Sequence, residues 1–176
     1  MNVNVNNGSG KKLQLRAMEP EDLDILFEIE NDTDDWGMGA TNVPYSKSCL
    51  LDYITNASYD IYTDKQVRLM VDNEEGEVVG IVDLVNFSPA HQRAELGIIV
   101  KKECRHQGYA TSIVRLVCEY GRKVLHLHQI YAVVPESNNS CRELLKGSGF
   151  QESMLLKQWL YDGAEYTDAH FFQIFF

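Results

Sequence analysis

Apolar residues recur along the chain with two different spacings, one typical of strands and the other of helices. Two stretches rich in β-branched and apolar residues, 66–72 and 77–87, are predicted to be strands. The polar segment 73–76 between them ends in a glycine and predicts a hairpin turn. Strands are also predicted over 12–18, 91–100, 129–134, 152–161 and 166–175.

Four segments carry apolar residues at the three- and four-residue spacing of an amphipathic helix. The longest spans 108–125. Another begins near Pro20, because proline suits the first turn of a helix and the acidic residues beside it suit the positive end of the helix dipole. A third is predicted over 46–57 with Ser46 as its N-cap. A short fourth helix, over 138–146, is closed by glycines.

These elements follow in the order strand, two helices, three strands, helix, strand, helix and two strands. That order predicts an α/β (α+β) domain with a central mixed, mostly antiparallel sheet of about seven strands, flanked by about four helices. The length of 176 residues favours a single core. Residues 1–11 are rich in asparagine and glycine and lack the apolar stretch of a secretory signal. We therefore expect a flexible leader over 1–11 and one domain over 12–176.

The chain carries 26 acidic and 16 basic residues, which gives a formal net charge of −10. This charge argues against a nucleic-acid partner, whose phosphates require a basic surface. It suits a small cationic substrate that is steered by the field of the protein, although solubility alone also accounts for an acidic surface. No stretch approaches the length of a membrane-spanning apolar helix, so no membrane partner is expected.

Four cysteines are widely spaced and show neither the CxxC nor the Cys/His spacing of a zinc site. We therefore expect no metal and no disulfide framework. Unpaired cysteines suit a reducing compartment, so a cytoplasmic location is expected. We assign no catalytic role to any of the five histidines. The cysteines are Cys49, Cys104, Cys118 and Cys141.

The most informative stretch joins the strand that ends at Val100 to the helix that begins at 108. Unpaired amides at a helix N-terminus form a ready anion site. Gly108 allows the backbone to approach a phosphate closely, and Arg105 adds a cationic contact. The chain has neither the GxGxxG motif for dinucleotides nor the GxxxxGK[ST] motif for nucleoside triphosphates. The pattern favours a pyrophosphate held by main-chain amides, although an ordinary strand–turn–helix connection has a similar sequence.

A second segment, 135–150, resolves part of this ambiguity. The two segments together resemble the GNAT superfamily, whose acetyl-CoA motif is Q/R-x-x-G-x-G/A at a strand-to-helix turn and whose second signature is N-x-x-A/S-x-x-L-Y-x-x-x-G-F. The resemblance extends over roughly 12–175. The matching positions are Arg105, Gly108 and Ala110 in the first motif, and Asn138, Leu144, Gly149 and Phe150 in the second, with Cys141 at the small-residue position.

The resemblance implies an acetyl-CoA-dependent N-acetyltransferase that transfers the acetyl group directly to a primary amine. It implies that the pantetheine arm of the coenzyme pairs with a strand as an added strand. Most of the rate acceleration would come from positioning the two reactants. The residues implied in cofactor binding are Ile98, Ile99 and Val100 for the arm, then Arg105, His106, Gln107, Gly108, Tyr109, Ala110 and Thr111 for the pyrophosphate, and Asn138 and Cys141 near the arm.

Acetyl transfer requires removal of the ammonium proton, which needs a carboxylate or a water chain near the amine. Glu95 lies at the start of the strand that leads to the cofactor site, and Asp83 lies on the neighbouring strand. On antiparallel strands the two can line one cavity, where a raised pKa would suit a base. We therefore predict Glu95 and Asp83 as catalytic residues. The alternative is that either one faces solvent or pairs with Arg93.

One position departs from the family pattern. Many members have a tyrosine five residues before the phenylalanine of the second signature, as the acid for the departing thiolate, and here that position is Leu145. The acid is then missing, replaced, or unnecessary, since a thiolate with a pKa of about 8.5 leaves readily. Tyr131 and Tyr161 are candidate replacements. Cys141 is either a weak donor or a small core residue.

Within the superfamily, the chain is most similar to the spermidine/spermine acetyltransferases. A polyamine is a long cation, so acidic walls suit it, and Asp32, Asp34 and Asp35 could add to them unless they lie in a solvated turn. The expected acceptor is therefore a polyamine such as spermidine. The similar segments are 15–17, 44–45, 79–84, 93–95 and 127–131.

Other functions and an assembly follow from the same resemblance. The ribosomal-protein alanine acetyltransferases share the overall pattern and would need a groove for a peptide N-terminus. Because of Leu145, a degenerate module that binds acetyl-CoA without turnover is also an alternative. A regulatory polyamine site is not favoured, since Asn42, Ser46 and Leu50 stand where the spermidine enzymes have acidic residues. We expect a homo-oligomer, a dimer or larger, in which a partner covers the apolar strand at 171–176.

Overall fold

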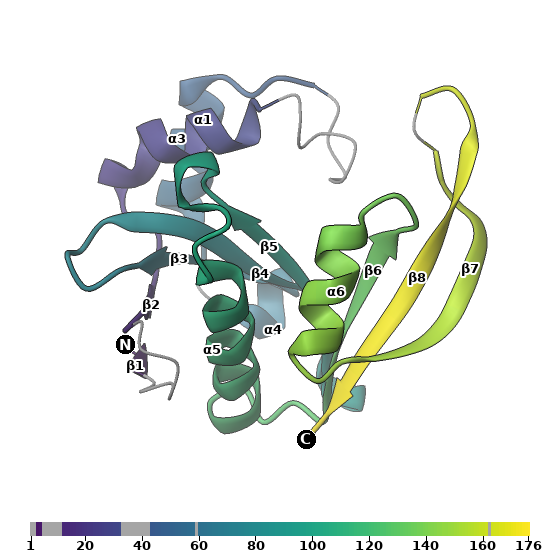
Figure 1. Cartoon of the computed structure of the whole chain (residues 1–176). Helices are drawn as coiled ribbons and strands as arrows, with labels where there is room; N and C mark the ends of the chain where they lie inside the picture. Colours follow the sequence, from purple (N-terminus) through teal and green to yellow (C-terminus); the bar gives the residue numbers. More distant parts are fainter. Residues whose placement is uncertain (1–2, 5–11, 33–42, 59, 162) are drawn as a thin grey trace.

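The computed structural model describes residues 3–4, 12–32, 43–58, 60–161 and 163–176 (Figure 1). The segment predicted as a leader lies outside the described residues, apart from Val3 and Asn4. The strands are β1 (Val3–Asn4), β2 (Gln14–Arg16), β3 (Val67–Asp72), β4 (Val78–Ser88), β5 (Arg93–Val100), β6 (Gln129–Pro135), β7 (Gln151–Tyr161) and β8 (Tyr166–Phe175). The helices are α1 (Leu23–Glu30), α3 (Lys47–Asn56), α4 (Ile61–Asp64), α5 (Tyr109–Lys123) and α6 (Asn139–Gly147).

All the strands belong to one sheet in the order β1-β2-β3-β4-β5-β6-β8-β7. Every neighbouring pair is antiparallel except β5 and β6, which are parallel. The mixed, mostly antiparallel α/β fold predicted from the sequence is therefore confirmed. The strand beyond the seven predicted is the two-residue β1, which pairs with Gln14 and Leu15 of β2.

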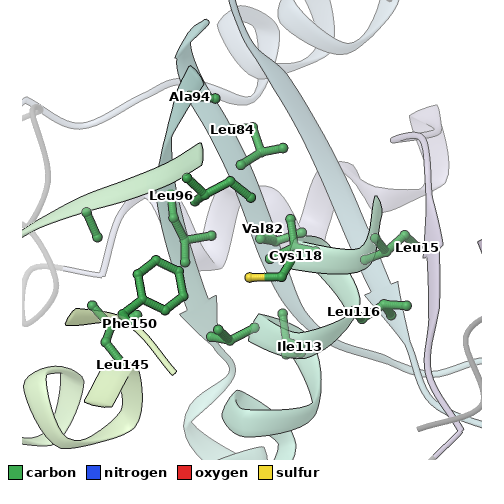
Figure 2. Packing of buried hydrophobic residues seen from close by; sticks show 14 of the residues in the cluster. Leu15, Val82, Leu84, Ala94, Leu96, Ile113, Leu116, Cys118, Leu145 and Phe150 are labelled. Carbon is green, nitrogen blue, oxygen red and sulfur yellow. The ribbon is translucent and has the colours of Figure 1, made fainter. Parts of the chain in front are cut away.

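Helices cover both faces of the sheet, because β4 is apolar on both faces. Val82 and Leu84 point toward the larger core, which they share with Ile113 and Leu116 of α5 (Figure 2). Ile81 points the other way. That second core contains Leu26 of α1, Leu50 and Ile54 of α3, and Met70 of β3. The alternation follows from the two-residue period of a strand.

Three short elements were not predicted. A 3-10 turn over Pro89–His91 and a left-handed Gln92 (φ 48°) delay the start of β5 to Arg93. A second 3-10 turn, Lys102–Cys104, separates β5 from α5. Helix α4 has only one turn, and a single turn is too short for a hydrophobic period to show in the sequence.

Candidate active site

Strands β5 and β6 separate near the centre of the sheet. Strand β5 pairs with β4 up to Val100, but it pairs with β6 only over Arg93–Glu95. Beyond Glu95 no other strand of the described chain lies on that side of β5, and Figure 1 shows the two strands diverging. The sheet is therefore open along the second half of β5.

The open edge exposes the backbone of alternate residues. The Lys101 amide donates to the Val79 carbonyl at 3.0 Å, so the odd-numbered residues of β5, Ile99 among them, direct their backbone groups to β4. Ile98 and Val100 then direct theirs toward the open side. The Val100 carbonyl accepts a hydrogen bond from Nε of Arg105 at 2.9 Å. The backbone groups that the predicted pantetheine arm could pair with are therefore those of Ile98 and the amide of Val100.

Helix α5 begins beside this edge with the geometry of an anion site. Gly108 is its N-cap, with a φ of 81° that favours glycine. Tyr109, Ala110 and Thr111 form the first turn of α5, where the backbone amides point out of the helix N-terminus. A Cβ built on Gly108 would meet no atom within 4 Å, so the space in front of the helix is open.

In the loop before α5, some of the polar groups form hydrogen bonds within the loop itself. The Arg105 amide donates to the Lys102 carbonyl at 3.3 Å, so this amide is engaged within the 3-10 turn. The Gln107 side chain donates to the Glu103 carbonyl at 2.7 Å. The backbone of His106, two residues before Gly108, has a left-handed conformation (φ 60°). The Arg105 amide and the Gln107 side chain therefore stabilise the loop itself.

Helix α6 begins with Asn138 on the other side of the opening. Its Oδ1 accepts hydrogen bonds from the Cys141 amide at 3.1 Å and from Ser140 Oγ at 3.0 Å, so Asn138 serves as the N-cap. Cys141 is half-buried against the larger core, and burial raises the pKa of its thiol. Leu145 is fully buried in the same core. This environment agrees with a core role for Cys141.

The structure places Glu95 and Asp83 on one face of the sheet. Glu95 is opposite Val85 and Asp83 is opposite Gly97, which puts the two carboxylates diagonally across neighbouring strands. Asp83 accepts two hydrogen bonds from Arg68, from Nε at 2.7 Å and from Nη2 at 2.9 Å. The predicted alternative of a pair with Arg93 named the wrong partner for Asp83, because Arg68 lies directly opposite it on β3.

Glu95 has different neighbours at the point where β5 and β6 separate. Its carboxylate accepts a hydrogen bond from Asn86 Nδ2 at 2.8 Å. Asn86 is left-handed (φ 51°) and lies in a β-bulge of β4, where the register shifts between Val85 and Ser88. A bulge re-aims a side chain, and this one turns Asn86 toward Glu95. Asn86 could not be identified from the sequence, because a β-bulge depends on how the strands pair.

Tyr131 of β6 lies directly opposite Glu95 in the last pair before the opening. Its ring stacks on Phe171 of β8, with centroids 5.2 Å apart. Burial raises the pKa of the Tyr131 phenol, and the nearby carboxylate of Glu95 raises it further through charge and a hydrogen bond. Tyr161, the other predicted substitute, is exposed at the end of β7 and donates to the Gly163 carbonyl at 3.0 Å. The structure brings Tyr131, and not Tyr161, to the site.

The acidic residues predicted as walls are only partly described. Asp32 accepts from Lys102 Nζ at 3.0 Å, which ties the end of α1 to the loop before α5. A cavity of about 150 Å³ lies at this junction. A larger one, of about 290 Å³, lies beside Tyr53 and Arg68. Asp34, Asp35 and Asn42 lie outside the described residues. Ser46 caps α3, and Leu50 is buried in the second core, so both serve the fold.

The described residues contain no group of three His, Cys, Asp or Glu side chains that could hold a metal ion. Nor do they contain a helix that is long and apolar enough to span a membrane.

Comparison with known proteins decides the family. Residues 12–151 match the family model of the acetyltransferase (GNAT) domain. The chain belongs to the GNAT acetyltransferase family. It is 30% identical over 163 residues to the spermidine N(1)-acetyltransferase of Escherichia coli K12, which covers 92% of this chain and 84% of that protein. The GNAT fold and the acetyl-CoA donor predicted from the sequence are thereby confirmed.

Two further relatives bear on the substrate of this GNAT enzyme. The crystal structure of the Vibrio cholerae spermidine N-acetyltransferase in complex with CoA and spermine superposes with a TM-score of 0.83 at 26% identity, covering 93% of this chain and 95% of that one. A Bacillus subtilis protein named as a ribosomal N-acetyltransferase candidate is 22% identical over 170 residues, covering 92% of this chain and 90% of that protein.

Proposed function

We propose that this GNAT acetyltransferase transfers an acetyl group from acetyl-CoA directly to a primary amine of a polyamine such as spermidine. One observation carries the proposal: the sheet opens beyond Glu95, with the N-terminus of α5 beside the opening and Glu95 at its closed end. A thioester that lies in this opening would be next to a carboxylate. The spermidine enzymes among the relatives support the choice of acceptor.

The residues around the opening fit the coenzyme. The backbone of Ile98 and the amide of Val100 would pair with its extended arm as a strand does. The amides of Tyr109, Ala110 and Thr111 would bind its pyrophosphate with the help of the helix dipole. The open space at Gly108 gives the phosphates room to approach those amides. Asn138, at the start of α6, would contact the arm from the other side.

The chemistry requires a neutral amine, because an ammonium has no lone pair for attack. Glu95 would accept the proton that the amine nitrogen loses as it bonds to the thioester carbon. Asp83, held by Arg68, would contribute to the negative wall that favours a cation. The net charge of −10 would attract a polyamine toward the site over a longer range.

A protein N-terminus is the second candidate acceptor. The relative named for ribosomal N-acetylation favours it. The two acceptors differ in shape and charge, since a peptide places one amine at the end of a neutral backbone whereas spermidine carries several cationic amines.

Measuring release of free CoA separates these possibilities. Purified enzyme with acetyl-CoA would be given spermidine, spermine or a short peptide with an N-terminal alanine. We expect turnover with the polyamines and a kcat at least 100-fold lower for Glu95→Gln. Turnover of the peptide alone would replace the polyamine proposal with the N-terminal one. Binding of acetyl-CoA without turnover of any acceptor would contradict both.

We also propose that the enzyme is a homo-oligomer in the cytosol. The strand at 171–176, which was expected to be the edge that a partner covers, lies between β6 and β7, and the exposed edge is β7 instead. Strand β7 carries Met154 and Trp159, each 59% exposed. An exposed apolar strand at a sheet edge favours association. Light scattering coupled to size exclusion should give a mass of at least two chains, and Trp159→Glu should lower it. A wild-type monomer at micromolar concentration would exclude the assembly.

A further inference from the structure

The structure contains a side chain suited to replace the missing acid of the second signature. Tyr131 faces Glu95 in the last pair of residues before β5 and β6 separate. This inference rests on the proposed function, because it needs the thioester to lie in that opening. The sulfur of the thioester would then lie next to the residue pair formed by Tyr131 and Glu95.

Every element packed against Tyr131 contributes to its surroundings. On β5 the charged neighbours are Glu95, which raises the pKa of the phenol, and Arg93, which lowers it. On β4 the neutral amide of Asn86 contacts both the phenol and Glu95. On β8 the ring of Phe171 stacks against it at an interplanar angle of 19°. The ring is thus fixed by packing, while the hydroxyl is held by polar partners.

The other groups considered for this role are less suitable. Leu145 fills the family's tyrosine position, and its side chain has no proton to donate. Cys141 is half-buried against the larger core, and its thiol forms only weak hydrogen bonds. Tyr161 lies on β7, the edge strand beyond β8, with its hydroxyl bonded to Gly163. Of these groups, Tyr131 alone lies opposite Glu95 in the last residue pair before the opening.

We propose that Tyr131 is a catalytic residue that protonates the departing coenzyme thiolate, and that Glu95 resupplies its proton. The amine nitrogen bonds to the thioester carbon, and the carbon–sulfur bond breaks with its electron pair on sulfur. The phenol gives its proton to that sulfur. Glu95, which has taken a proton from the amine nitrogen, passes it to the phenolate oxygen. One proton therefore moves from nitrogen to sulfur, and both side chains return to their initial states.

The surroundings of the phenol suit a donor at neutral pH. Burial and the Glu95 carboxylate raise the pKa of Tyr131, so the phenol stays protonated through the physiological range. The same shift makes it a weaker acid than a free tyrosine. The expected gain is therefore at the lower end of the range for general acids, on the order of 100-fold.

The test compares Tyr131→Phe with the control Tyr161→Phe at saturating spermidine, with the concentration of acetyl-CoA varied. The phenyl ring of Phe keeps the contact with Phe171, so the thermal midpoint should stay within a few degrees. We expect kcat to fall on the order of 100-fold in Tyr131→Phe, with the KM for acetyl-CoA unchanged, and Tyr161→Phe to match the wild type. Wild-type kcat in Tyr131→Phe would overturn the proposal.

A second donor distinguishes proton donation from a structural role. The acetyl thioester of 4-nitrothiophenol releases a far more acidic thiol, which leaves without an acid. With this donor, after subtraction of the uncatalysed rate, Tyr131→Phe should approach the wild-type rate, whereas Glu95→Gln should stay slow. An equal loss with both donors would assign Tyr131 a structural role and refute proton donation. Failure of the wild type to acetylate spermidine would instead contradict the proposed function.

Discussion

Arg68 and Asp83 are joined across β3 and β4 by two hydrogen bonds, at 2.7 and 2.9 Å. A third contact joins Arg68 Nη1 to Glu30 at the end of α1. The three side chains are mostly buried, and the ring of Tyr53 on α3 lies 5.8 Å from the guanidinium. One arginine therefore fastens two helices to the sheet beside the proposed acceptor site.

This arrangement predicts that Asp83→Asn acts mainly on stability. Removing the charge of Asp83 leaves the buried Arg68 with Glu30 as its remaining carboxylate partner, so the free energy of unfolding should fall by about 2 kcal/mol. Urea denaturation measures it. The exposed pair of Asp24 and Lys47 provides the control, and Asp24→Asn should cost less than about 1 kcal/mol. A kcat that drops as far in Asp83→Asn as in Glu95→Gln would give Asp83 a chemical role instead.

Gly108→Trp should abolish acetyl-CoA binding while the fold persists. The indole would occupy the open space before α5, and the left-handed backbone there would add strain of about 1–2 kcal/mol. Gly76 is a matched control, since it has a φ of 79°, no atom within 4 Å of a built Cβ, and a place in the β3–β4 turn. Calorimetry should show binding in Gly76→Trp and none in Gly108→Trp. Equal affinity in the two variants would contradict the placement of the pyrophosphate.

The parts of the fold that were predictable depend on local sequence. The period of α5, the cap at Ser46 and the turn at Gly76 each depend on a few neighbouring residues, and the structure has all of them. The one-turn helix α4 and the 3-10 turns are too short to produce a period. The pairing of Val3 and Asn4 with β2 depends on contacts distant in sequence, which no local pattern encodes.

In the candidate site too, the features set by local sequence were predictable and those set by strand pairing were not. Gly108 and the helix start were found because their spacing is local. Three other features arise only when separate strands align. They are the ion pair of Asp83 with Arg68, the β-bulge at Asn86, and the pairing of Tyr131 with Glu95. Sequence reasoning therefore identified Tyr131 by residue type alone and missed Arg68 and Asn86.

Acid should destabilise the enzyme partly through Asp22. Burial opposes its charge, but hydrogen bonds from Arg16, at 2.6 and 2.8 Å, and from the Glu19 amide hold the pKa of Asp22 below its usual value. A lowered folded-state pKa gives stability that is present above the ordinary carboxyl pKa, about 3.9, and is lost as the pH falls through the folded value.

The measurement is urea denaturation at several pH values. Because Arg16 keeps its ion pair with Asp72, Asp22→Asn should cost about 2 kcal/mol at pH 7, and the difference from the wild type should shrink below about pH 4 as the wild-type carboxylate becomes protonated. The exposed Asp52 offers a comparison, since Asp52→Asn should track the wild type throughout. A difference that stays constant with pH would show that the charge of Asp22 is not the cause.

Thiol labelling should distinguish the cysteines by burial. Cys49 is exposed on α3, whereas burial raises the pKa of Cys118 to about 12. A disulfide reagent at pH 8 should label Cys49 first and Cys118 only after unfolding, because the thiolate is the reactive form. Cys49→Ser should remove the fast phase. Persistence of that phase in the variant would show that another cysteine reacts first.

The separation of β5 from β6 has a mechanical consequence. The two parts of the sheet, β1 to β5 and β6 to β8, are joined by only three residue pairs, and beyond Glu95 no strand of the described chain pairs with the open edge of β5. An extended coenzyme arm bound along this open edge would connect the two parts of the sheet. Occupancy should then stiffen the whole molecule, slowing amide exchange along β5 and raising the melting temperature with ligand concentration. In the proposed complex, the co-substrate would supply the strand that the sheet lacks beside the second half of β5.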